Sequence, residues 1–127
     1  MTIDPQLKLR AELASDELMA NVKGLLAVMV SSEDGFEVAA RVQNSAQITR
    51  LSAMASSLSA LGDLAGQESN LGECEKVMVE AKDGLIVILQ VRRPGFPLVL
   101  SAIASKSTVV GQLLYFAKQA ALSIEAI

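Results

Sequence analysis

The sequence predicts an α+β fold, an α/β sandwich in which helices cover both faces of a five-stranded sheet. Three segments are apolar almost without interruption, at residues 25–30, 85–91 and 98–104. Two others, at residues 36–42 and 76–82, alternate apolar and polar side chains. Strands that are apolar throughout need cover on both faces, whereas alternating strands tolerate water on one face. The continuous segments are therefore predicted as the central strands and the alternating segments as the two edges.

A first helix is predicted to begin at Asp4 and Pro5. Aspartate is a good N-cap, and proline is tolerated at the first helical position because its missing N–H costs nothing there. Apolar residues then recur at helical spacing, at Leu9, Leu13, Leu18 and Val22. Gly24 is expected to end this helix and open the first strand.

Glycine-containing turns connect the predicted strands. Residues 33–35 (Glu-Asp-Gly) join the first two strands, and residues 82–84 (Lys-Asp-Gly) join the third and fourth. In the first of these turns Gly35 is expected to supply the positive φ that a hairpin turn requires. A further turn over residues 92–97 leads to the fifth strand, which makes the order helix, two strands, helix, three strands, helix.

The two remaining helices follow from apolar spacing. Asn44 and Ser45 offer a cap for the middle helix, whose apolar spacing fades near Gly66, before a polar loop over residues 66–70. Its sheet-facing stripe is predicted to be Ile48, Leu51, Ala55, Leu58, Gly62 and Ala65. Ser105 or Ser107 can cap the last helix. Its apolar face is predicted to be broad, with Val109, Val110, Leu113, Leu114, Ala117, Ala120, Ala121 and Ile124.

Length, charge and composition limit the classes of protein to which this chain can belong. The chain has 127 residues, and we expect one domain over residues 1–127. Its net charge of −3 and its 3% of aromatic residues argue against nucleic acid and an anionic membrane surface as partners. No apolar run approaches the ~20 residues of a membrane span. The first five residues do not resemble a signal peptide, and one cysteine cannot form an internal disulfide, so we expect a cytoplasmic protein.

The usual chemistry of an enzyme is absent from the sequence. There is no histidine, which removes the commonest general base and metal ligand, and no cysteine pair to hold zinc. Residues 104–108 lack the glycine-rich segment of a phosphate-binding loop. Cys74 is more simply an inert thiol than a redox switch. Arg41 and Arg50 are more simply surface arginines than arginine fingers for a GTPase. We expect no catalytic, metal or cofactor site.

The predicted sheet implies a partner. One helix covers roughly two strands, so a middle helix alone on one face leaves apolar surface exposed. A second, small-residue stripe on that helix permits close approach of another helix, and a two-fold copy is the economical one. The predicted interface stripe is Ala53, Ser56, Ser57, Ala60 and Leu64.

The third strand supports the same dimer. If it pairs antiparallel with its own copy around Met78, then Lys76 faces Glu80 of the partner, twice. Opposite charges across a ladder contribute roughly 0.2–1 kcal/mol each. The alternative is that Lys76, Glu80 and Lys82 only protect an open edge from aggregation.

Several strings resemble the Roadblock/dynein light-chain family, specifically its bacterial MglB-like members. They are GLLAVMVSSEDGFEVAA, EKVMVEAKDGLIVILQV and LVLSAIASKSTVVGQLLYFAKQAA, and the resemblance covers nearly the whole chain. It implies a profilin- and longin-like fold, with an antiparallel sheet of order 2-1-5-4-3, two helices on one face and one on the other. It also implies dimers with paired middle helices and paired third strands.

The resemblance further implies a function. Family members commonly bind small Ras-like GTPases, and some modulate the partner's nucleotide hydrolysis without hydrolysing anything themselves. We therefore expect a non-catalytic dimeric regulator or scaffold for such a GTPase, as a homodimer or a heterodimer with a related protein. Arg50 and Asp63 are predicted to face the GTPase. The alternatives are an assembly module of a motor or complex whose partners ignore the nucleotide, and a small-ligand sensor.

Overall fold

The computed structural model of the chain describes residues 3–42 and 47–127. The helices are α1 (Pro5–Asn21), α2 (Ile48–Glu68) and α3 (Val110–Glu125). The strands are β1 (Leu25–Ser32), β2 (Glu37–Arg41), β3 (Lys76–Ala81), β4 (Gly84–Val91) and β5 (Leu98–Ser105). The predicted order of helices and strands is confirmed.

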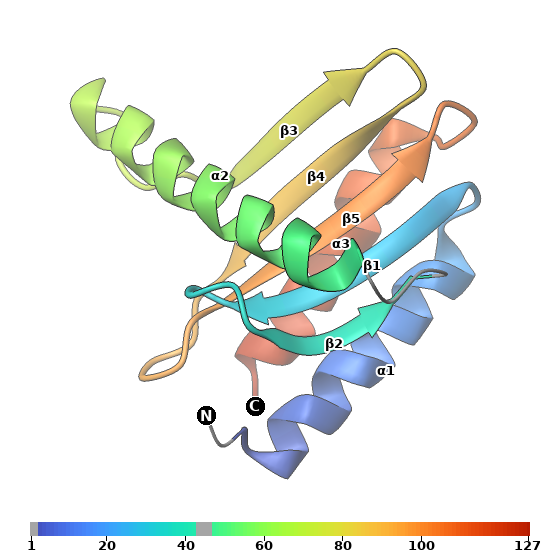
Figure 1. The fold of residues 1–127 in the computed structure, drawn as a ribbon, viewed down its shortest axis with the longest axis horizontal. Helices are drawn as coiled ribbons and strands as arrows, with labels where there is room; N and C mark the ends of the chain where they lie inside the picture. Colours follow the sequence, from blue (N-terminus) through green and yellow to red (C-terminus); the bar gives the residue numbers. More distant parts are fainter. Residues whose placement is uncertain (1–2, 43–46) are drawn as a thin grey trace.

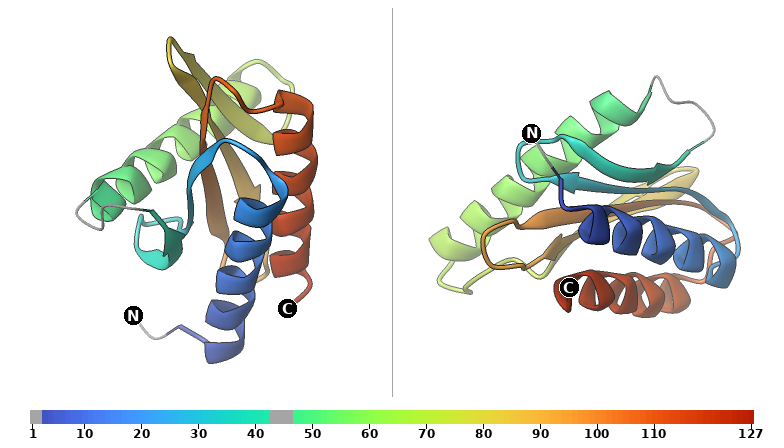
Figure 2. Two further views of the ribbon diagram at one scale, coloured as in Figure 1. Left: turned by 90° about the vertical axis from the view of Figure 1, so that its right-hand side faces the viewer. Right: turned by 90° about the horizontal axis from the view of Figure 1, so that it is seen from below.

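The five strands form one antiparallel sheet in the order β2-β1-β5-β4-β3, so the predicted order and both predicted edges are confirmed. α2 crosses one face of the sheet alone, whereas α1 and α3 lie side by side on the other (Figures 1 and 2). We call the face under α2 the upper face and the face under α1 and α3 the underside.

The main core lies on the underside, where alternate side chains of β1, β4 and β5 meet α1 and α3. Its fully buried large side chains include Leu7, Leu18, Val28, Val30, Val87, Leu98, Leu100, Leu113 and Ile124. The upper-face cluster is much smaller and consists of Ala55, Ile88 and Val99, with Leu58, Val77 and Ile86 packed against them. The three continuous apolar segments are the three central strands, as predicted.

The predicted start of α1 is confirmed, and its predicted buried face is confirmed only in part. The Asp4 carboxylate accepts a hydrogen bond of 2.8 Å from the Gln6 N–H, and Pro5 is the first helical residue. Leu18 and Val22 are buried as predicted, but Leu9 and Leu13 are exposed. The first part of the helix buries Leu7, Ala11, Ala14 and Ser15 instead. Two alanines on that face let α1 approach the sheet and α3 closely, so the spacing of large apolar residues selected the wrong side chains there.

The alternation of residues 36–42 does not persist as alternating burial. The β1–β2 pairing shifts register between Val30 and Ser31. Val38 and Ala39 are both buried although they are neighbours, and Phe36 is exposed. A bulge of this kind inserts an extra residue into the ladder and bends the strand, which breaks the period of two.

Two predicted helix boundaries need correction. α2 continues through Gly66 to Glu68. The chain after the helix turns back against position 66, and a Cβ there would lie 2.3 Å from the Gly72 carbonyl oxygen, so the position requires glycine. α3 begins at Val110 with Val109 as N-cap and without a side-chain cap. The hydroxyls of Ser105 and Ser107 instead lie 2.8 Å from each other. The predicted Asn44-Ser45 cap lies outside the described residues.

α2 is held to the sheet by small side chains. Of its 21 residues only Ser52, Ala55 and Ser59 are buried. The hydroxyls of Ser52, Ser31 and Ser101 are also buried, and none of them has a hydrogen-bond partner among the described residues. Small residues permit close approach but contribute little apolar burial. α2 is therefore attached less strongly than the two helices of the underside.

Candidate interaction surface

The outer side of α2 presents large apolar side chains to solvent. Leu61 is 59% exposed, Leu64 52% and Met54 49%. Met54 lies four residues before Leu58, and Leu61 lies three residues after it. Both exposed side chains therefore lie along the same flank of α2 as Leu58, which itself packs against the sheet. We call these exposed side chains of α2, together with the adjoining exposed Val79 of β3, the α2 face.

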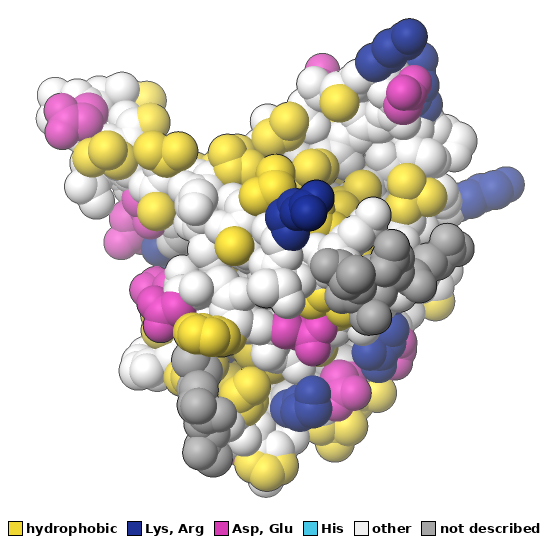
Figure 3. All heavy atoms as spheres, viewed as in Figure 1, with side chains coloured by type: hydrophobic (Ala, Val, Ile, Leu, Met, Phe, Trp, Pro, Cys, Tyr) yellow, Lys and Arg dark blue, Asp and Glu magenta, His cyan; other side chains and the backbone are white. Residues whose placement is uncertain are grey.

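Figure 3 views the molecule from the α2 side. Hydrophobic side chains line α2 and continue over the part of the sheet that α2 leaves open. Contiguous apolar surface of this kind on a soluble domain commonly marks an interaction site, because burying it against a partner removes it from water. The sequence interpretation that the middle helix leaves apolar surface exposed is thus supported by the fold.

The residues predicted for the α2 interface divide between two sides of the helix. Ser57 and Leu64 are exposed on its outer surface. Ser56 donates a hydrogen bond of 3.2 Å to the Ser32 carbonyl and so holds α2 to the end of β1. Ala53 lies against the Gly35 turn, and Ala60 lines a cleft beside it.

The residues predicted for the β3 interface lie together on an open edge. β3 pairs with β4 on one side, with Met78 opposite Val87, and is the last strand of the sheet. Lys76 and Glu80 are exposed, whereas Met78 is half-buried against the main core. Because Met78 packs into the core, Lys76, Met78 and Glu80 all face the underside.

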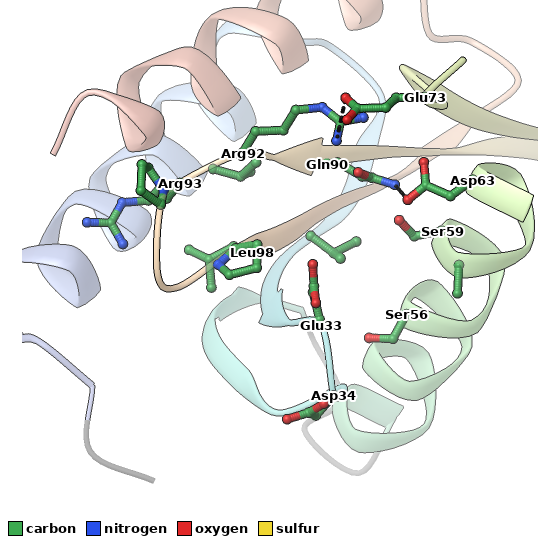
Figure 4. Close-up of a pocket in the computed structure, with 15 residues that line it drawn as sticks. Glu33, Asp34, Ser56, Ser59, Asp63, Glu73, Gln90, Arg92, Arg93 and Leu98 are labelled. Atoms are coloured by element: carbon green, nitrogen blue, oxygen red, sulfur yellow. Dashed lines mark hydrogen bonds and ion pairs between the residues drawn. The ribbon is translucent and has the colours of Figure 1, made fainter. Parts of the chain in front are cut away.

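A polar cleft with a volume of about 530 Å³ lies on the other side of α2 (Figure 4). Glu33 and Asp34 line it from the β1–β2 turn and Arg92 from the β4–β5 turn, whereas the Arg93 guanidinium points away and donates to the Ile127 carbonyl at 3.0 Å. Arg92 is committed within the chain, with its guanidinium 3.1 Å from the Glu73 carboxylate. The cleft is therefore bordered by charges of both signs.

Asp63 is a structural residue of this cleft. Its carboxylate accepts a hydrogen bond of 2.6 Å from the Gln90 side-chain amide and another of 3.0 Å from the Cys74 N–H. These bonds tie α2 to β4 and to the segment before β3. That Asp63 also faces a GTPase stays a prediction.

The two arginines considered from the sequence differ in their surroundings. Arg50 is exposed in the first turn of α2, one turn before Met54. Arg41 donates to Asp16 at 2.6 Å and lies 3.8 Å from Glu12. The hydrogen bond from Arg41 lowers the pKa of Asp16, and the same bond raises the pKa of Arg41. Arg41 is thus engaged within its own chain and Arg50 remains the more accessible cation.

Residues 3–42 and 47–127 contain no group of three or more histidine, cysteine or acidic residues placed to hold a metal ion. Nor does this part of the chain contain a helix long and apolar enough to cross a membrane.

Sequence reasoning missed Met54 and Leu61. Their positions four before and three after the sheet-facing Leu58 predict one side of the helix, but a sequence alone does not tell whether that side is covered. The small-residue stripe was chosen because it favours close helix packing. The exposure of the larger residues shows that the apolar surface lies beside that stripe.

An open apolar face and an open strand edge on an α/β sandwich are features typical of domains that bind other proteins. The Roadblock/LC7 domain family matches this chain over residues 13–114. The chain belongs to the Roadblock/LC7 family. A search of the curated proteins found no match.

Solved structures share the fold. A Roadblock/LC7 domain from Streptomyces avermitilis is 21% identical with a TM-score of 0.83, covering 91% of this chain and 94% of that one. MglB from Myxococcus xanthus is 13% identical with a TM-score of 0.84, covering 99% and 92%. An MglB with a tetrameric arrangement is 12% identical with a TM-score of 0.86, covering 99% and 93%. At these identities the likeness establishes the fold.

Proposed function

We propose that this protein is a non-catalytic, cytoplasmic, dimeric regulator or scaffold of a small Ras-like GTPase, with residues 1–127 as one Roadblock domain. The observation that carries the proposal is the α2 face, where large apolar side chains of α2 adjoin the open edge of β3. Membership of the Roadblock/LC7 family and the likeness in fold to MglB support the same function.

The proposed dimer joins two α2 faces and two β3 edges around one two-fold axis. Pairing of β3 with its copy around Met78 places Lys76 opposite the partner's Glu80 and extends the sheet from five strands to ten. The same axis brings the second α2 beside the first, which covers the exposed Met54 and Leu61. Each contact alone is small, but together they remove an apolar face and a strand edge from water.

The GTPase would bind across the paired α2 helices, where only a dimer presents a continuous surface. Arg50 is the accessible cation at one end of α2. A regulator of this kind recognises the nucleotide state of its partner because the switch segments of a GTPase are ordered by the γ-phosphate. Preference for the GTP-bound form is therefore the property that distinguishes a regulator from an assembly module.

The test is capture of partners from native cell lysate with tagged protein, once with a non-hydrolysable GTP analogue and once with GDP. Mass spectrometry of the captured proteins is expected to identify a small GTPase enriched with the GTP analogue. The Leu61→Glu variant on the α2 face is expected to lose both the dimer and this enrichment, while Leu9→Glu, an equivalent change of an exposed leucine on α1, keeps both. Partners that ignore the nucleotide would overturn the GTPase proposal in favour of an assembly module.

A further inference from the structure

The polar cleft beside α2 contains a buried hydroxyl group that has no partner within the described part of the chain. Ser59 is only 6% exposed and lines the cleft, and its oxygen points from α2 into the open space (Figure 4). Among the described residues, no hydrogen bond is formed to or from this hydroxyl. Buried hydroxyls normally have a partner, because leaving one unpaired costs free energy. Ser59 therefore points to a ligand that enters the cleft.

The charges that face the cleft are negative. Its ionic lining consists of four carboxylates and two guanidinium groups, from Glu33, Asp34, Asp63, Glu73, Arg92 and Arg93. Arg92 pairs with Glu73 at 3.1 Å, and the Arg93 guanidinium points away toward the Ile127 carbonyl. The two hydrogen bonds that Asp63 accepts come from neutral donors. No cation of the described chain pairs with the remaining three carboxylates, so the cleft selects a cationic ligand.

The placement of these three carboxylates selects an organic cation over a metal ion. Glu33 points into the cleft from the β1–β2 turn, and Asp34 lies at its rim (Figure 4). Asp63 projects from α2, one turn after Ser59. In the described ranges no three such groups converge on the position of one metal ion. The volume of about 530 Å³ instead lies within the range of small-molecule sites.

We propose that the polar cleft binds a guanidinium group, carried either by an arginine side chain of a partner protein or by a free small molecule. A guanidinium spreads five N–H donors over a plane and can pair with a carboxylate through two of them, whereas an ammonium concentrates three donors at one point. Acceptors that lie on separate elements, as Glu33 and Asp63 do, match the wider group. Ser59 accepts one further N–H.

The apolar part of the lining favours the same group. Pro97, Leu98 and Val99 form part of the cleft wall. A guanidinium is more weakly hydrated than an ammonium, so it loses less on leaving water for such a wall. The site lies within one chain and goes beyond the proposed function, because neither the dimer nor the GTPase contributes a group to it.

The test uses four small probes and the full chain. N-acetyl-L-arginine N-methylamide presents the guanidinium on a blocked backbone, as in a polypeptide. The citrulline analogue has nearly the same shape without the charge, and the lysine analogue carries an ammonium. Agmatine carries a guanidinium without a backbone and so represents the free small molecule. Binding is followed by the shifts of backbone amide signals in isotope-labelled protein, which also locate the ligand.

The arginine probe is expected to saturate shifts around residues 33–35, 59–63 and 90–92 with a Kd on the order of 0.1–5 mM. The lysine probe is expected to bind about 3-fold more weakly or worse, and the citrulline probe to show no saturation up to about 50 mM. Agmatine binding about 10-fold tighter than the arginine probe would identify a free small molecule as the source. Equal or weaker binding of agmatine would identify an arginine side chain.

Three variants test the assigned groups. Ser59→Ala is expected to weaken binding of the arginine probe by about 2- to 10-fold, while the thermal unfolding midpoint stays unchanged or rises, because the hydroxyl has no partner among the described residues. Glu33→Gln is expected to weaken binding by about 2- to 5-fold, since solvent screens this exposed charge. Asp83→Asn makes the same change of charge in the exposed β3–β4 turn, so it is the matched control and leaves the Kd unchanged.

The contrary outcomes are distinct from those that test the GTPase proposal. Absence of saturable shifts, or saturable shifts confined to other residues, overturns the site. Equal binding of the arginine and citrulline probes, or of the arginine and lysine probes, overturns the choice of a guanidinium. Equal weakening by Glu33→Gln and Asp83→Asn does the same for the assigned carboxylates. Each of these results leaves the proposed function standing, and failure of GTPase capture leaves the cleft site standing.

Discussion

Replacing Asp63 by alanine tests whether this residue is primarily structural. The change removes the acceptor of two hydrogen bonds, one from the Cys74 N–H and one from the Gln90 side chain. Both donors belong to segments that α2 must hold, namely β4 and the approach to β3. We expect Asp63→Ala to lower the free energy of unfolding and to loosen the C-terminal half of α2.

The magnitude follows from the two bonds. Hydrogen bonds to charged groups contribute about 1.5–3 kcal/mol each, but Asp63 is half-buried, so water partly replaces the lost acceptor. Alanine is the better helix former by up to about 0.7 kcal/mol, which offsets part of the loss. The expected net destabilisation is therefore about 1–3 kcal/mol.

The assay is urea denaturation at one fixed protein concentration, because dimerisation makes apparent stability depend on concentration. Glu68→Ala is the matched control, since Glu68 is exposed at the end of the same helix. A double-mutant cycle with Gln90→Ala isolates the shared bond, with an expected coupling of about 0.5–3 kcal/mol. A change in Asp63→Ala no larger than in Glu68→Ala would refute the structural role, and loss of GTPase capture at unchanged stability would make Asp63 a contact residue.

Four further substitutions test the packing and the electrostatics. Asp16→Asn is expected to lower stability at neutral pH in urea titrations; because the hydrogen bond from Arg41 lowers the pKa of Asp16, the difference is present above the ordinary carboxyl range and is lost as the pH falls through the lowered pKa. Gly84→Ala places a Cβ 2.1 Å from a carbonyl oxygen of β5 and is expected to lower stability by about 1–3 kcal/mol. Gly111→Ala in α3 meets no atom within 4 Å and is expected to raise stability by up to about 1 kcal/mol; a loss would contradict the open environment. Ser101→Ala is expected to leave stability unchanged or raise it in thermal melts, since its buried hydroxyl has no described partner; a loss above about 1 kcal/mol would indicate a hidden one.

The sequence predicted the sheet well because its signals are local. Segments that are apolar throughout predict central strands, and segments that alternate apolar and polar residues predict edge strands. Gly24 and Gly35 have the positive φ values that their turns require. The helices were harder to predict. α1 buries alanines rather than Leu9 and Leu13, because the fit against α3 and the sheet selects small residues there.

The candidate surface could be predicted only in outline. The expectation that the middle helix needs a partner followed from counting strands against helices, and the exposed Leu61 and Leu64 agree with it. The side of α2 that carries the large apolar residues depends on how the helix rotates over the sheet. That rotation is set by Ser52, Ala55 and Ser59 packing beneath it. Apolar periodicity identified Ala55 but not the two serines, because serine is not an apolar residue.

The measurement that tests the central claim most directly is the molar mass in solution of a charge-swapped series on β3, by sedimentation equilibrium. Wild-type protein is expected to have twice the 13.4 kDa of one chain. Lys76→Glu and Glu80→Lys are each expected to weaken the dimer, because each places like charges opposite one another. The double variant is expected to restore it, with Lys23→Glu as a neutral control. A wild-type mass of one chain, or a double variant no better than the singles, would contradict the β3-paired dimer.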